Sequence, residues 1–115
     1  MDLGSHTTMT IAALIATAAL SSAGAANAQP TGAQGLALAR QKNCMSCHSE
    51  NRALLGPALR DIAAKYASRP DAQSYLARKI TEGSSGVWGP VPMPANTQVS
   101  AAQAAALATW ILSLK

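Results

Sequence analysis

The sequence predicts an all-α fold with about four helices in one small domain. A length of 115 residues allows a single domain. Apolar residues in the second half recur three and four positions apart, as on one face of a helix, and no two segments alternate as paired strands do. Hydrophobic residues make up 49% of the chain and charged residues only 12%, which excludes a disordered polyelectrolyte.

The N-terminal segment has the features of a cleaved export signal. Residues 10–20 form an uncharged apolar run, and small residues follow it up to Ala26-Asn27-Ala28, which fits the A-x-A pattern of a signal-peptidase site. A membrane-spanning helix needs about 20 apolar residues, so a retained membrane anchor is the less favoured alternative. That alternative predicts a purified chain that begins near Met1. We expect a signal peptide over 1–28, a single mature domain over 29–115, and a periplasmic protein without stable membrane insertion.

Two helices are predicted in the first half of the mature domain. The first runs from Thr31 to about Lys42, although Leu36 and Leu38 point to opposite sides of it. The second begins near Pro57, because proline is favourable in a first turn, and ends before the next proline in the chain. Its apolar face consists of Leu59, Ile62, Ala63 and Tyr66.

Two further helices are predicted in the second half. The third runs from about Asp71, a favourable N-cap residue, to Gly83, which can adopt the left-handed conformation that often ends a helix. The last begins after Ser100, which is a suitable N-cap because Gln103 follows three residues later. The apolar stripe of this last helix, which should face the core, is Leu107, Trp110, Ile111 and Leu114.

Few large apolar side chains are available to fill the space between these helices. The chain has no Phe, only two Trp and two Tyr, and alanine, which buries little area, is frequent. Domains of this size commonly gain stability from a disulfide, a metal or another added group. The only two cysteines are too close together for a disulfide between them to contribute much. A bound group is therefore expected at the centre, with Trp110, Tyr66 and Tyr75 as packing residues.

Residues 44–48, Cys-Met-Ser-Cys-His, carry the C-x-x-C-H pattern of c-type haem attachment. Two intervening residues let both sulfurs reach neighbouring vinyl groups as thioethers, and the adjacent histidine places an imidazole nitrogen beneath the iron. A thioredoxin-like redox pair would need a βαβ setting, and a structural zinc site would need a further ligand, since the only other histidine, His6, lies in the leader. In an oxidising compartment both cysteines should be committed to a bond. The motif therefore predicts one covalently bound haem c.

A second motif precedes the last helix, where residues 88–94 read Trp-Gly-Pro-Val-Pro-Met-Pro. Together with the attachment motif at the end of a first helix and Gly56-Pro57 shortly after it, this loop resembles a class I cytochrome c. More narrowly, the chain is similar to the small bacterial electron carriers of the five-fifty-one spectral type. The loop is far more specific to this group than the attachment motif. The resemblance covers about residues 35–115 and implies the cytochrome c fold, with the helices packed around the haem.

The resemblance also implies which residues hold the haem. Cys44 and Cys47 match the cysteines that form thioethers, His48 matches the proximal ligand, and Met93 matches the distal ligand through its sulfur. Pro57 matches a proline whose carbonyl accepts a hydrogen bond from the His48 ring, a contact that fixes ring orientation and ligand basicity.

Three more positions match residues around the haem. Trp88 matches an indole that donates to a haem propionate, with ordinary burial of the side chain as the alternative. Lys79 stands where relatives carry a basic side chain near a propionate, and Arg78 beside it is an alternative. Asn96 matches an asparagine that hydrogen-bonds near the methionine sulfur and steadies the loop.

Ligation by both His48 and Met93 would leave the iron no open position, so the remaining chemistry is one-electron exchange. Pro90, Pro92 and Pro94 restrict the backbone around Met93, so little entropy is lost when its sulfur is held at the iron. A distal methionine also raises the reduction potential relative to a second histidine. We expect a high-potential, diffusible, monomeric electron carrier that is not an enzyme.

The charge balance indicates the kind of partner. Residues 29–115 contain nine basic and four acidic side chains, a net charge of +5, which favours an acidic partner. The basic residues are scattered along the chain, which does not suggest nucleic acid. The resemblance implies a nitrite reductase, a terminal oxidase or a membrane quinol-oxidising cytochrome complex as partners. Lys42, Arg52, Lys65 and Lys79 are expected to form a basic rim, with an unpatterned charged surface as the alternative.

A function of a different class remains open at this point. The chain would be a haem c sensor or an enzyme subunit if the Met93 ligand gave way to a small gas or a peroxide. Exposure of the reduced protein to carbon monoxide separates the two functions, because only the sensor or enzyme would change its spectrum readily.

Overall fold

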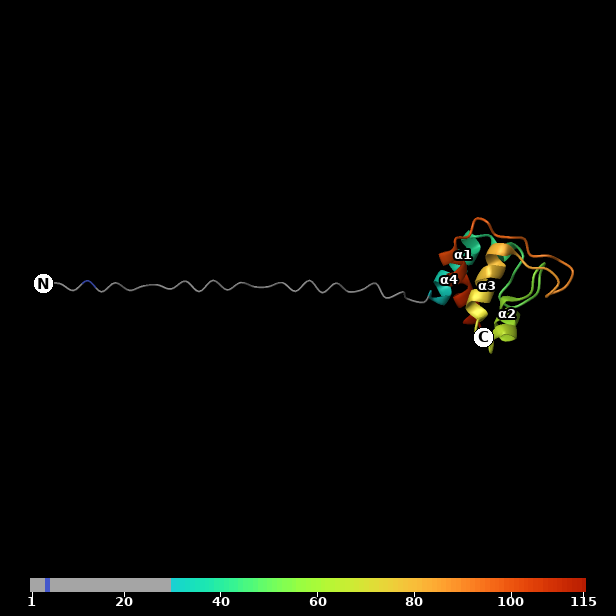
Figure 1. Ribbon diagram of the computed structural model, residues 1–115, viewed down its shortest axis with the longest axis horizontal. Helices are drawn as coiled ribbons and strands as arrows, with labels where there is room; N and C mark the ends of the chain where they lie inside the picture. The colour runs from blue at the N-terminus through green and yellow to red at the C-terminus, as the bar shows by residue number, and fades with distance from the viewer. Residues whose placement is uncertain (1–3, 5–29) are drawn as a thin grey trace.

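The computed structural model describes Gly4 and residues 30–115. Its elements are the helices α1 (Gly32–Gln41), α2 (Leu59–Tyr66), α3 (Ala72–Glu82) and α4 (Ala101–Leu112), with a short 3-10 helix, η1 (Cys44–Ser46), after α1 (Figure 1). Within the described part of the chain, the only strand-like feature is an isolated bridge between Ser84 and Met93. The predicted all-α class is therefore confirmed. The predicted signal peptide lies, apart from Gly4, outside the described residues.

Helix α4 forms the centre of the core, because it contacts α1, α2 and α3. The predicted capping box is present: the Gln103 N–H donates to Ser100 Oγ over 3.1 Å, and the Ser100 N–H donates to Gln103 Oε1 over 3.0 Å. Trp110 is 1% exposed, and Leu107 and Ile111 are buried with it, as the helical spacing predicted. None of the described helices has the length and apolarity that crossing a bilayer would require.

Helix α1 packs on α4 through small residues. Gly35 and Ala39 are its buried positions, and the indole of Trp110 lies directly over Gly35, where a Cβ atom would come within 2.0 Å of the indole Cγ. Leu36 and Leu38, which the sequence placed on opposite sides, are both half-buried and both pack against the core. Helix α1 can therefore approach α4 closely because its buried positions carry small side chains or none.

Helix α2 begins two residues later than predicted. Ala58 is its N-cap, in an extended conformation with φ −59° and ψ 138°, so the chain becomes helical only at Leu59. The reason lies in Pro57, whose carbonyl faces His48 and does not join a helix. The predicted apolar face is buried and consists of Leu59, Ile62, Ala63 and Tyr66.

Helix α3 follows Asp71, but the prediction that this side chain caps the helix is wrong. The carboxylate makes no capping bond and is held by Arg69, with Nε 2.5 Å from Oδ1 and Nη2 3.1 Å from Oδ2. Hydrogen bonding to Arg69 keeps the pKa of Asp71 below its usual value. The predicted end at Gly83 is present, and its N–H donates to the Lys79 carbonyl over 2.9 Å. Its φ of 84° is positive, which favours glycine, but its ψ of 176° differs from the left-handed helical conformation that was predicted.

Candidate functional site

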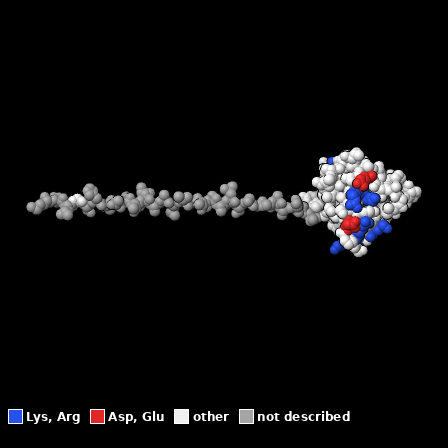
Figure 2. Space-filling model, viewed as in Figure 1, with Lys and Arg blue, Asp and Glu red and all other residues white. Residues whose placement is uncertain are grey.

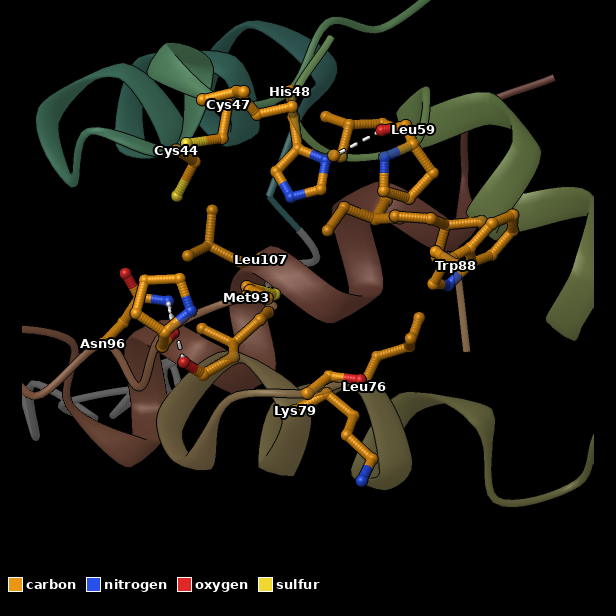
Figure 3. A pocket seen from close by; sticks show the side chains of 18 of the residues that line it. Cys44, Cys47, His48, Leu59, Leu76, Lys79, Trp88, Met93, Asn96 and Leu107 are labelled. Carbon is orange, nitrogen blue, oxygen red and sulfur yellow. Dashed lines mark hydrogen bonds between the residues drawn. The ribbon is translucent and has the colours of Figure 1, made fainter. Parts of the chain in front are cut away.

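A cavity of about 430 Å³ lies between the helices, within the range of about 300–1,000 Å³ of cofactor pockets. Its wall is mostly apolar and includes Leu59 from α2, Leu76 from α3 and Leu107 from α4 (Figure 3). All the site residues predicted from the sequence line this cavity: Cys44, Cys47, His48, Pro57, Lys79, Trp88, Met93 and Asn96. The fold therefore brings together residues from both halves of the domain.

The two cysteines lie on one wall, in a tight turn that follows α1. Asn43 makes the turn with a φ of 65°, a conformation that asparagine tolerates better than most residues, and its Oδ1 accepts a hydrogen bond of 2.5 Å from Ser46 Oγ. The N–H groups of Cys47 and His48 both donate to the Cys44 carbonyl, over 3.2 and 3.1 Å. Burial raises the pKa of the Cys44 thiol, and nearby Cys47 raises it further.

His48 is held in one orientation from two sides. Its Nδ1 lies 2.8 Å from the Pro57 carbonyl oxygen, which can only accept, so Nδ1 carries a proton and Nε2 is the nitrogen left to bind a metal. Gly56 lies against the ring, where a Cβ atom would come within 2.6 Å of His48 Cε1. Figure 3 shows the ring extending from the attachment turn into the cavity. The imidazole is thus prepared to bind a metal through Nε2.

Met93 reaches the cavity from the opposite side, on the loop after α3 (Figure 3). Its backbone exchanges two hydrogen bonds with Ser84, of 3.0 and 2.8 Å. A Cβ atom at Gly83 would come within 2.7 Å of the Met93 carbonyl oxygen, so the loop lies directly on the end of α3. Asn96 Nδ2 donates to the carbonyls of Ile80, over 2.9 Å, and Pro94, over 3.4 Å. These contacts fix the backbone on both sides of the methionine.

Trp88 and Lys79 lie at the rim of the cavity. Trp88 is 41% exposed, and Lys65 Nζ lies 5.4 Å from its ring centroid. The Lys79 side chain lines the cavity, but its Nζ lies 5.3 Å from the Tyr75 ring centroid and points away from the cavity centre in Figure 3. Arg78, the alternative to Lys79, does not line the cavity.

The predicted basic rim is present in part. Lys42 and Lys79 line the cavity, and Lys65 lies over Trp88, whereas Arg52 is exposed and does not line it. On the face shown in Figure 2, basic side chains gather over α3 and α2, with acidic side chains next to them. The surface near the cavity is therefore mixed in charge, with an excess of cations close to the rim.

The packing partners of the site were not predicted from the sequence. Gly56 beside Pro57 carried a weak signal, because a glycine in a loop often permits a close approach. Asn43 carried a weak signal too, because asparagine tolerates the left-handed conformation that it adopts. The hydrogen bonds between Gln98 and Lys42 carried none, since they join residues 56 positions apart. Local patterns cannot report such distant contacts.

The donor set fits a haem c. Two thiols lie on one wall, an imidazole presents a free Nε2, and a thioether faces it across a mostly apolar cavity. Across residues 30–115, no group of three or more His, Cys, Asp or Glu side chains is arranged to hold a metal ion by itself. A structural zinc site therefore lacks its ligands in the described region.

Comparisons with known proteins point to one family. The family described as "Cytochrome c" matches residues 32–115. Cytochrome c-552 of Nitrosomonas europaea is 60% identical over 78 residues, which cover 68% of this chain and 76% of the relative. Cytochrome c-551 of Pseudomonas aeruginosa is 47% identical over 78 residues, which cover 68% of this chain and 74% of the relative. The crystal structure of the wild-type Nitrosomonas protein superposes with a TM-score of 0.69 at 59% identity, over 70% of this chain and 99% of that one.

Proposed function

The chain belongs to the cytochrome c family, and on this premise we propose that it is a periplasmic, monomeric one-electron carrier with His48 and Met93 as iron ligands. Membership of this family means a covalently attached haem c and a function in electron transfer rather than enzymatic catalysis. The observation that supports the ligation most directly is the entry of the two side chains into one cavity from opposite sides. The predicted signal peptide over 1–28 supports the location.

A haem c bound in this cavity supplies reversible one-electron exchange at its iron. In the proposed site, Cys44 and Cys47 form the thioethers, and His48 offers Nε2 while Pro57 accepts from Nδ1 and so increases ligand basicity. Met93 offers a soft sulfur that favours the reduced state and raises the reduction potential relative to a second histidine.

Buried leucines keep water away from the site. Leu59, Leu76 and Leu107 line the cavity and are themselves buried. An apolar surrounding penalises the additional net charge of the oxidised state and therefore raises the potential further. Because Gly83 and Ser84 hold the backbone of Met93 in place, we expect the protein to rearrange little between oxidation states.

Trp88 and Asn96 complete the proposed site. In the proposed site, the indole N–H of Trp88 at the rim donates to a haem propionate, and the Lys79 stem lies at the same cavity. Asn96 steadies the loop through the carbonyls that it bonds. These roles are proposed together with the axial ligands.

A carrier with both axial positions filled should not bind carbon monoxide. We expect the spectrum of the reduced holoprotein at neutral pH to remain unchanged when carbon monoxide is added, because Met93 already occupies the distal position. Absorption spectroscopy before and after addition measures this directly. A ready spectral change would favour the sensor or enzyme subunit and would exclude a firmly ligated carrier.

The proposed partners are acidic redox proteins, such as a nitrite reductase, a terminal oxidase or a quinol-oxidising cytochrome complex. Lys42, Lys65 and Lys79 lie at or beside the cavity rim, where they would meet an acidic surface. We expect association rates to fall about tenfold or more between roughly 0.01 M and 0.15 M salt, because the Debye length shrinks from about 30 to about 8 Å.

Stopped-flow electron exchange with the partner checks this dependence on salt. Lys65→Gln should slow the low-salt reaction, while Arg40→Gln, which removes the same charge from an exposed position of α1 outside the cavity wall, should slow it less. Rates that stay flat across salt concentration would show that basic residues do not steer the encounter.

A further inference from the structure

Two side chains connect the segment before the attachment motif to the segment after Met93. Lys42 Nζ donates to the Gln98 carbonyl over 3.2 Å, and Gln98 Nε2 donates back to the Lys42 carbonyl over 3.3 Å. We call this reciprocal pair the Lys42–Gln98 strap. Lys42 is the C-cap of α1, two residues before Cys44, and both strap residues lie at the cavity.

The strap continues into the methionine loop. Gln98 Nε2 also donates to Asn96 Oδ1 over 3.1 Å, and the amide of Asn96 donates to the carbonyls of Ile80 and Pro94. The backbone N–H of Asn96 adds a second bond to Ile80, of 3.2 Å. A continuous chain of hydrogen bonds therefore leads from the end of α1 to the residue that follows Met93.

The strap differs from the other supports of the loop in what it joins. Ile80 in α3 and Ser84, two residues after α3, hold the loop on the distal side of the cavity. Among the described residues, the bonds of the strap are the only hydrogen bonds between residues 32–58, which carry His48, and residues 80–100, which carry Met93. Among the hydrogen bonds of the described residues, only those of the strap join the side of the cavity that carries His48 to the side that carries Met93.

We propose that Gln98 is a positioning residue for the distal ligand, which keeps Met93 opposite His48 by tying Asn96 to Lys42. The inference rests on the proposed ligation by Met93. A contact that is present only while the loop is closed stabilises the closed loop by its own free energy. An external ligand that must displace the Met93 sulfur therefore competes against the strap as well as against the iron–sulfur bond.

Imidazole binding to the oxidised holoprotein tests the proposal. Gln98→Met keeps the length of the side chain but removes its donor, and Thr97→Val makes a comparable isosteric change at the exposed neighbour, which takes no part in the strap. We expect Gln98→Met to bind imidazole about three- to tenfold more tightly than the wild type, because the loss of one or two hydrogen bonds changes a binding constant by about this factor. Thr97→Val should bind imidazole as the wild type does.

Imidazole binding is measured by the loss of the sulfur-to-iron charge-transfer band. Guanidinium unfolding of the same proteins measures their global stability. If Gln98→Met unfolds more easily but binds imidazole as Thr97→Val does, the strap is only structural and the proposal is wrong. Absence of that band from the oxidised wild-type protein would instead refute ligation by Met93, and the inference with it. The two failures are thus distinguishable.

Discussion

Replacing Met93 with leucine is expected to lower the reduction potential of the holoprotein by roughly 100 mV or more, within the span of about 0.8 V over which axial ligands act. The change removes the soft sulfur that favours the reduced state and keeps nearly the same side-chain volume, so the fold should persist. Spectroelectrochemical titration measures the potential. The reduced variant should also bind carbon monoxide, because its distal position is vacant.

Met45→Leu is the matched control for this experiment. Met45 lies inside the attachment motif and packs against the core, but it does not line the cavity. The same loss of a thioether at this position should leave the potential and the response to carbon monoxide as in the wild type. If Met93→Leu and Met45→Leu had equal potentials, Met93 would not be the distal ligand.

Gly35→Ala is expected to destabilise the holoprotein by about 3 kcal/mol or more, at or above the upper end of the usual cost of overpacking. The new Cβ atom would lie 2.0 Å from Cγ, 2.3 Å from Cδ1 and 2.6 Å from Cβ of Trp110. That indole is 1% exposed and lines the cavity that the haem occupies in the holoprotein, so we expect α1 to move away from α4. For a domain of this size the melting temperature should fall by roughly 10 °C or more.

Gly32→Ala provides the comparison within the same helix. A Cβ atom at Gly32 meets nothing within 4 Å, so the substitution gains helix propensity, up to about 1 kcal/mol, without a clash. Guanidinium unfolding of both holoproteins separates packing from propensity. Equal stabilities of Gly35→Ala and Gly32→Ala would mean that the close contact of α1 with Trp110 is not essential to the fold.

The helices were predictable where their signals are local. The start of α4 depends on Ser100 and Gln103, three residues apart, and its buried face follows from helical spacing. The start of α2 and the cap of α3 were predicted wrongly, because in each case another group binds the residue at the start of the helix. Pro57 turns its carbonyl to His48 and delays α2, and Arg69 holds the Asp71 carboxylate that was expected to cap α3.

The residues of the site were predictable as a set because two short motifs carry most of them, and every one lines the cavity. The supports of the site were not, because they depend on contacts between distant segments. Gly56 makes room for the His48 ring, and Gln98 reaches Lys42 across 56 positions. Only the fold reveals that the segment before the attachment motif meets the segment after Met93.

Iron-edge X-ray absorption of the oxidised wild-type holoprotein tests the proposed axial pair most directly. Ligation by His48 and Met93 predicts a sulfur neighbour at bonding distance from the iron together with nitrogen neighbours, and the loss of that sulfur signal in Met93→Leu. A wild-type spectrum with nitrogen or oxygen neighbours only, or one identical to that of Met93→Leu, would contradict it.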